Sequence, residues 1–259
     1  MFLRKYKIVS GASRNIVKIN SKWFLKKKFT QLLWTKKSKA GRTNTGRISV
    51  WSKGSILKKV RFPKINYNFR YSNIIFISTF QLIPFQNKLV SLCFLSTGGV
   101  TYLQSTTQFR IFDFFKAPLK IKNQLNHIIQ PIVSLLVRIK LLSKTSLLEL
   151  YPGSGVQYVR SSGSSARFLN INWLNHTALI ILPSGVRKSF SLYSIASIGA
   201  VDLKIKRLLR NTKAGFWVTY GNKSRTRGVA MNPVDHPHGG RTKTIKNPRT
   251  PWGKPTKKK

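Results

Sequence analysis

Acidic residues are scarce in this chain. Its 259 residues include 48 lysines and arginines but only 4 aspartates and glutamates, which gives a formal net charge of +44. Positive charge in such excess destabilises a compact state unless counter-charge is supplied. The composition excludes the mixed-sign surface of an ordinary soluble protein and indicates a polyanionic partner, with nucleic acid as the first choice.

The chain also has one cysteine and no long apolar run. A single cysteine excludes an intramolecular disulfide framework and the usual four-ligand zinc site built on cysteines. We expect Cys93 to be a small buried side chain in a reducing compartment. The most apolar stretches, 74–95 and 128–142, are interrupted by polar and proline residues, so neither reaches the roughly 18 residues of a membrane span. Glycine-rich nucleotide-binding loops of the common spacings are absent as well.

The cations are concentrated at the two ends of the chain. Residues 1–70 hold 20 lysines and arginines and residues 203–259 hold 16, whereas residues 71–202 hold 12 together with three of the four acids. The hydrophobic content of 41% and aromatic content of 12% are too high for a wholly disordered basic chain. The sequence therefore predicts a packed middle and two ends that bind a polyanion.

The middle is rich in short β-branched and aromatic runs separated by turn residues. They lie at 74–77, 89–95, 100–103, 147–150, 158–159, 168–174, 178–182 and 186–193. Short strands at this spacing predict a mainly β fold of small antiparallel barrels. Trp173 falls within one of these runs, so we expect it in the core.

Two segments do not follow the strand pattern. Segment 116–144 is apolar without a clear period, and we expect a connection that includes a short helix. Segment 202–210 is expected to be helical, because Leu203, Lys206, Arg207 and Arg210 would then share one side. We expect its cations to face a phosphate backbone.

The stretch KKSKAGRTNTGRISVWSK, residues 36–53, interleaves cations with glycines and small polar side chains. Glycine allows backbone N–H groups to approach phosphates closely, and arginine binds phosphate or base edges in a forked geometry. This pattern predicts a loop that binds folded RNA.

The stretch GVAMNPVDHPHGG, residues 228–240, contains the only acid in the basic C-terminal part. Three interpretations compete. Asp235 could orient His236 as a general base, although no nucleophile is marked out. Asp235, His236 and His238 could bind zinc, although a fourth ligand is not evident. In the interpretation that we favour, the prolines stiffen an extended chain, the imidazoles contact RNA bases, and Asp235 pairs with an arginine or a hydrated Mg²⁺.

These motifs resemble a known family. The run MNPVDHPHGG at 231–240, with KAG at 213–215, RGVAMN at 227–232 and TPWG at 250–253, closely resembles the second protein of the large ribosomal subunit, a universal family. Weaker similarity covers KYKIVSGASRNIVKI at 5–19, KAGRTNTGRIS at 39–49 and PGSGVQYVRSSGSSA at 152–166. The sequence departs from the family pattern at WSKGSILKK, residues 51–59, and after Gly240, where residues 241–246 replace a further glycine and acid.

The resemblance implies an OB-like barrel followed by an SH3-like barrel with long basic extensions. The expected parts are a basic N-terminal arm at 1–70, an OB-like RNA-binding domain at 71–145, an SH3-like barrel at 146–212 and an extended rRNA-binding tail at 213–259. The family lies near the peptidyl transferase region, supports subunit association and acts as a scaffold rather than an enzyme. The family's essential histidine corresponds to His236.

We expect large-subunit rRNA, neighbouring ribosomal proteins and, at the subunit interface, the small subunit as partners. No cofactor is expected apart from Mg²⁺ shared with rRNA at Asp235. The predicted rRNA-binding residues are Lys36, Lys37, Lys39, Gly41, Arg42, Asn44, Gly46, Arg47, Lys53, Arg160, Arg167, Lys213, Lys223, Arg225, Arg227, Asn232, Asp235, His236, His238, Gly239, Gly240, Arg241 and Trp252.

The diverged first half is rich in Phe, Ile, Asn and Lys, as AT-rich coding would produce. This bias favours a mitochondrial ribosome, with a plastid ribosome as the second choice. Because the similarity begins near Lys5, we expect no long cleavable presequence. Two other functions remain open: an organellar nucleoid or DNA-packaging protein, and a hydrolase that uses Asp235 and His236.

Overall fold

The computed structural model describes most of the chain. The described residues are 3–11, 13–20, 22, 24, 29–35, 39–54, 61–68, 74–83, 86–116, 132–240, 245 and 247–256. Their contacts divide into two units. Unit 1 comprises residues 1–36 and 59–212, and unit 2 comprises residues 37–58 and 213–259.

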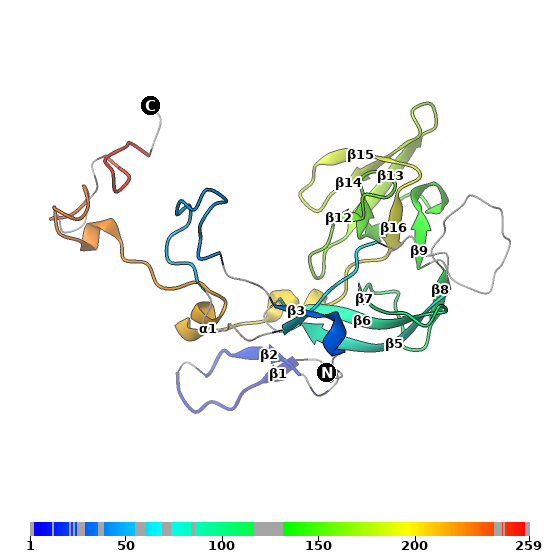
Figure 1. Ribbon diagram of the computed structural model, residues 1–259, viewed down its shortest axis with the longest axis horizontal. Helices are drawn as coiled ribbons and strands as arrows, with labels where there is room; N and C mark the ends of the chain where they lie inside the picture. Colours follow the sequence, from blue (N-terminus) through cyan, green and yellow to red (C-terminus); the bar gives the residue numbers. More distant parts are fainter. Residues whose placement is uncertain are drawn as a thin grey trace. The chain divides into compact units, whose positions relative to one another are not determined.

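Four antiparallel strands form the first sheet of unit 1, in the order β7-β6-β5-β8. They are β5 (Ile74–Ile83), β6 (Lys88–Leu95), β7 (Val100–Gln104) and β8 (Phe114–Lys116). Figure 1 shows β5, β6 and β7 side by side. At the start of β5, Ile75 and Ile77 are fully buried while their neighbours are more exposed, which is the period of two of a half-buried strand. The strands predicted at 74–77, 89–95 and 100–103 are confirmed.

The second sheet has six strands in the order β15-β14-β13-β10-β16-β9. Its members are β9 (Val133–Leu135), β10 (Lys144–Ser146), β13 (Ala166–Asn172), β14 (Thr177–Ile181), β15 (Arg187–Ser191) and β16 (Ile195–Ile198). A separate pair joins β11 (Leu148–Glu149) to β12 (Val156–Tyr158). Phe168, Ile180 and Phe190, from the six-stranded sheet, belong to the hydrophobic core of this half. The mainly β, antiparallel fold is confirmed, and the two sheets fit an OB-like barrel followed by an SH3-like barrel.

The only buried carboxylate of the described residues organises this second half. Glu149 is 2% exposed. Its Oε1 accepts the N–H groups of Gly153 at 3.0 Å and Gly155 at 2.9 Å, and its Oε2 accepts that of Ile195 at 3.2 Å. These hydrogen bonds satisfy a buried charge and tie the turn between β11 and β12 to β16.

The N-terminal segment contributes two more strand pairs. Strand β1 (Leu3–Lys5) pairs with β2 (Val17–Ile19), and β3 (Leu33–Thr35) pairs with β4 (Arg61–Pro63). A short 3-10 helix, η2 (Thr30–Leu32), precedes β3. Leu32 and Phe62 pack against a buried cluster that includes Tyr102, so this part of the basic arm covers the first sheet.

Unit 2 has almost no interior. It contains helix α1 (Ala214–Thr219) and the 3-10 helix η5 (Gly228–Ala230). Of its described residues only Gly221 and His236 are buried. All three hydrophobic clusters lie in unit 1. Burial of apolar surface therefore stabilises unit 1 far more than unit 2.

Several local expectations were wrong. Trp173 is 62% exposed, because it lies in the turn that joins β13 to β14. Segment 202–210 forms only the short 3-10 helix η4 (Lys204–Leu208), which follows Leu203 in the left-handed region at φ +68°. Leu203 is buried and does not share the exposed side with Arg207 and Arg210. Within the predicted extended tail, α1 forms a short helix.

The connection at 116–144 is described only in part. Residues 117–131 lie outside the described residues, so the short helix expected there is not addressed, apart from the 3-10 helix η3 (Leu136–Arg138). Strand β9 and the start of β10 already belong to the six-stranded sheet, so that sheet begins before the predicted domain boundary at residue 146.

Cys93 is fully buried in β6, as predicted, and burial raises the pKa of its thiol to about 12. No helix among the described residues is long and apolar enough to span a membrane.

Candidate nucleic-acid interface

The predicted RNA-binding loop of the N-terminal arm is a tight turn that exposes its cations. The N–H of Thr43 donates to the carbonyl of Arg47 at 2.8 Å, and the Arg42 guanidinium donates to the carbonyl of Gly46 at 3.0 Å. Gly41 has φ +72°, and a Cβ there would lie 2.0 Å from the Val50 carbonyl oxygen. Residues 42–50 are all exposed. Gly41 therefore allows the loop to close, and both Arg42 and Arg47 are exposed.

Further contacts join this loop to the tail within unit 2. The N–H of Gly54 donates to the carbonyl of Gly221 at 3.0 Å, and the N–H of Lys223 donates to the carbonyl of Ser52 at 3.0 Å. The Lys53 ammonium donates to the side-chain oxygen of Asn222. An isolated antiparallel bridge between Lys53 and Asn222 thus brings together two predicted cations that are far apart in sequence, Lys53 and Lys223.

The motif at 228–240 folds into a compact turn around His236 and is not extended. His236 is 8% exposed. Its Nδ1 accepts the N–H of His238 at 3.0 Å, and its carbonyl accepts the N–H of Gly239 at 2.8 Å. A Cβ on Gly228 would lie 2.6 Å from the His236 ring, so the ring packs directly on the backbone of that glycine.

The second histidine connects this turn to the end of the tail. The Nε2 of His238 accepts the N–H of Arg249 at 2.8 Å, and the centres of the two imidazole rings lie 4.5 Å apart. Both imidazoles therefore help to hold the tail in this conformation, each through one ring nitrogen that accepts a backbone N–H.

The paired glycines at the end of the motif are required by close backbone contacts. A Cβ on Gly239 would lie 2.3 Å from the Asn232 carbonyl oxygen, and one on Gly240, at φ +75°, would lie 2.7 Å from Pro233. Both glycines hold the turn together. Their expected role in direct contact with RNA stays a prediction.

The geometry does not assemble a catalytic dyad or a zinc site at this turn. Asp235 is exposed whereas His236 is buried, and the His236 Nδ1 that a carboxylate would orient already accepts a backbone N–H. In the described part of the chain, no three His, Cys, Asp or Glu side chains gather in an arrangement that could hold a metal ion. Asp235 is left open to solvent.

A second group of cations gathers in unit 1 around Tyr67. The Lys88 ammonium donates to the Tyr67 hydroxyl at 3.3 Å, and the Arg160 guanidinium carbon lies 5.3 Å from the Tyr67 ring centre. The side chain of Gln104 completes the group, since it accepts the Tyr67 hydroxyl at 3.2 Å and donates to the Arg160 carbonyl at 2.6 Å. Two cations therefore contact the same tyrosine, Lys88 at its hydroxyl and Arg160 over its ring.

The electrostatics of this group favour an anion. Burial, followed by the positive charge of Arg160, lowers the pKa of Lys88. Burial raises the pKa of Tyr67, and Arg160 partly offsets that shift. No carboxylate of the described residues pairs with either cation. A phosphate oxygen at this place would supply the missing counter-charge.

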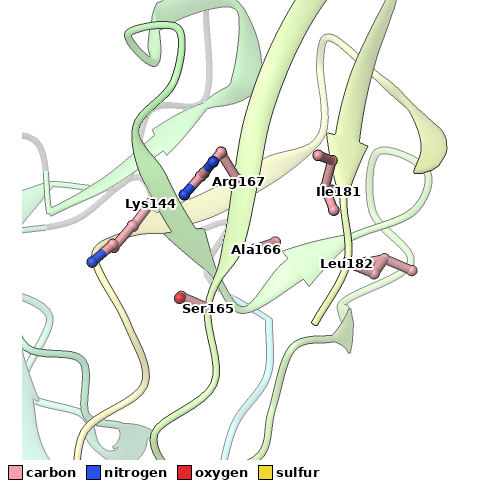
Figure 2. Close-up of a pocket in the computed structure, with 6 residues that line it drawn as sticks. All are labelled: Lys144, Ser165, Ala166, Arg167, Ile181 and Leu182. Atoms are coloured by element: carbon pink, nitrogen blue, oxygen red, sulfur yellow. The ribbon is translucent and has the colours of Figure 1, made fainter. Parts of the chain in front are cut away.

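Arg167 lies on the sheet beside another cation. It is the cross-strand partner of Lys144 in the pairing of β10 with β13, so both side chains project from the same face. Figure 2 shows both directed away from Ile181 and Leu182, which line the other side of the same pocket. Both cations are exposed.

The remaining predicted residues are exposed and widely spread. Lys213, Arg225, Arg227 and Asn232 are exposed in the tail, Lys39 donates to the side chain of exposed Asn44 at 3.4 Å, and Trp252 contacts Trp51. Lys36, Lys37 and Arg241 lie outside the described residues. The sequence interpretation missed Lys88, Tyr67 and Lys144. Cations are rare in the middle of the chain, and this rarity was the one sequence feature that could have drawn attention to Lys88.

Comparison with known proteins identifies the family. The model of the family described as "Ribosomal Proteins L2, C-terminal domain" matches residues 134–253, from β9 to the end of the TPWG motif. "Large ribosomal subunit protein uL2" of Brucella melitensis is 30% identical over 268 residues, which cover 100% of this chain and 92% of that protein. The chain belongs to the ribosomal L2 family. L2 proteins are structural components rather than classical enzymes, which confirms the non-enzymatic prediction.

Other L2 relatives are equally similar. The protein of Orientia tsutsugamushi is 31% identical over 268 residues, covering 100% of this chain and 94% of its own length. "Large ribosomal subunit protein uL2m" of Nyctotherus ovalis is 30% identical over 239 residues, covering 87% of this chain and 80% of its own. The resemblance carried by MNPVDHPHGG is thereby confirmed as an L2 relationship.

Proposed function

We propose that this chain is a structural constituent of the large subunit of a mitochondrial ribosome. In this proposal it binds and shapes large-subunit rRNA near the peptidyl transferase region and supports subunit association and translation. The similarity to large-subunit L2 proteins supports the large-subunit role, and the uL2m relative supports a mitochondrial location. Mg²⁺ held jointly by Asp235 and rRNA stays a prediction of the same proposal.

The main structural support for the proposed rRNA binding is the cation pair at Tyr67. Lys88 comes from the start of β6 and Arg160 from the segment after β12, and neither has a carboxylate partner among the described residues. Folding brings two like charges together, which is unfavourable unless a third, negative group is bound. An RNA phosphate has the charge and the acceptor oxygens to bridge them.

The test is to measure binding of the full chain to a transcript of its large-subunit rRNA as a function of salt. The double variant Lys88→Gln/Arg160→Gln should bind more weakly. The dependence of log affinity on log salt should also become less steep by about 0.7 to 0.9, because one bridging phosphate contributes roughly that amount. The matched control is Lys140→Gln/Arg187→Gln, which removes two exposed cations of unit 1.

Two results would overturn the proposal. One is an equal loss of affinity in the test and control variants, which would show that only net charge matters. The other is tighter binding to duplex DNA than to the rRNA transcript, as the DNA-packaging hypothesis requires. The compartment is tested separately. An antibody to the chain should detect it in large subunits sedimented from purified mitochondria and not in those from plastids.

A further inference from the structure

Two exposed tryptophans meet in unit 2. The ring centres of Trp51 and Trp252 lie 6.1 Å apart, and their planes are inclined at 36°. Trp51 is 43% exposed and Trp252 is 75% exposed. The contact therefore leaves much of both indoles open to solvent. Contiguous exposed aromatic surface is one of the marks of a binding site.

Both tryptophans lie in turns that are closed by backbone hydrogen bonds. Trp51 lies between the loop closed at Gly41, whose carbonyl accepts the N–H of Val50 at 3.1 Å, and the pairing of residues 52–54 with the tail. Trp252 lies at the tip of a hairpin, where the N–H of Gly253 donates to the carbonyl of Thr250 at 2.9 Å. The rings are presented on turns, so binding requires little further ordering of the backbone.

The surroundings of the pair are strongly cationic. Unit 2 contains 18 lysines and arginines and one acid, Asp235. Lys53 and Lys254 each lie two residues from one of the two tryptophans. An aromatic surface among cations matches a single-stranded nucleic acid, whose bases stack on rings while its phosphates contact cations. An apolar protein surface would match the rings but would leave the cations without partners.

We propose that Trp51 and Trp252 form a stacking platform for an unpaired RNA base. This inference rests on the proposed function, because it specifies what one part of the rRNA-binding surface recognises. Stacking needs only the π-face of a base, so the platform binds unpaired nucleotides with little sequence preference. In this proposal the two tryptophans bind the base of a nucleotide, whereas the cations of unit 2 bind its phosphates.

The test compares two probes of equal charge with the full chain. One is a short unstructured RNA oligonucleotide, and the other is the same oligomer with abasic residues. The wild-type chain should bind the first about 5- to 150-fold more tightly, since stacking contributes roughly 1 to 3 kcal/mol per base. Trp51→Ala/Trp252→Ala should lose at least fivefold of this preference and keep its affinity for the abasic oligomer.

Two further variants control the measurement. Trp173→Ala removes a tryptophan of similar exposure from unit 1 and should leave the preference unchanged. Trp51→Phe/Trp252→Phe keeps two aromatic faces and should keep part of the preference. Retained affinity for the abasic oligomer reports that unit 2 still presents its cations.

The outcomes separate this inference from the proposed function. If the double alanine variant keeps the full preference, the platform is refuted while salt-dependent RNA binding stands. If it loses affinity for both oligomers equally, the two rings serve only to join the loop to the tail, which also refutes the platform. If the wild-type chain binds neither oligomer at low salt, the proposed function itself fails.

Discussion

At the scale of single residues, the most demanding site is the turn around His236. The imidazole occupies the space that a side chain on Gly228 would need, and its Nδ1 accepts the N–H of His238. Gly228 is required for this contact and not for an unusual φ, since its φ is not positive. The position of the His236 ring thus depends on a glycine eight residues earlier.

We predict that Gly228→Ala displaces the His236 ring. The added Cβ would lie 2.6 Å from two ring atoms and 2.7 Å from a third, and such overpacking costs about 1 to 3 kcal/mol. Hydrogen exchange at the His238 N–H should accelerate, because its acceptor moves away. Gly215→Ala is the control, since a Cβ there meets nothing within 4 Å. Unchanged exchange at His238 in Gly228→Ala would contradict the prediction.

At the scale of elements, one carboxylate determines how three strands meet. The turn between β11 and β12 donates two N–H groups to Glu149, and the first residue of β16 donates a third. The apolar pattern of the sequence predicted strands in this region but not their connection. That connection depends on a long-range contact, from Glu149 to Ile195, which no local pattern encodes.

Glu149→Gln should destabilise unit 1 by about 1 to 3 kcal/mol. An amide has one acceptor oxygen where the carboxylate has two, so at least one buried N–H loses its partner. The midpoint of urea denaturation of the full chain should fall accordingly. Asp113→Asn makes the same chemical change at a half-buried carboxylate and should shift the midpoint much less. Equal shifts in the two variants would show that lost negative charge, and not the hydrogen bonds, is responsible.

At the scale of the whole molecule, burial and charge are divided between the two units. Unit 1 contains every hydrophobic cluster, whereas unit 2 buries only two of its described residues and contains 18 cations. Ordering each residue costs about 1 to 2 kcal/mol of conformational free energy, and unit 2 has little apolar burial to offset it. An RNA partner would supply the missing stabilisation through its phosphates.

We therefore predict that a non-specific protease cuts the free chain first within 39–54 and 213–256. The fragment that contains 132–212 should persist. Addition of the rRNA transcript should protect the first two segments at low salt, and protection should weaken as salt rises because counterion release contributes less. Mass spectrometry of the fragments over time measures this. Cleavage at equal rates in both units of the free chain would contradict it.

Apolar alternation and turn residues correctly predicted the hairpins and turns, which depend on residues close together in the sequence. The hairpin of β5 and β6 follows from alternating apolar residues around the turn at Asn87, which has φ +48°. The burial of Cys93 follows from its place within that pattern. The prediction that Trp173 lies in the core was wrong, because an aromatic residue extends an apolar run in the sequence whether or not the strand has ended. The loop at 41–50 was predicted from its glycines and arginines, which shape and charge a turn locally.

Composition, periodicity and the run MNPVDHPHGG can each be read along the chain, and they were enough to predict the charge imbalance, the mainly β class and the family. Which cations lie close together and which aromatic rings are exposed became evident only from the folded chain. Lys88 and Arg160 are 72 residues apart in sequence but both contact Tyr67. Trp51 meets Trp252 across most of the chain length. Such pairings depend on how strands and turns pack, and packing is a property of the folded molecule.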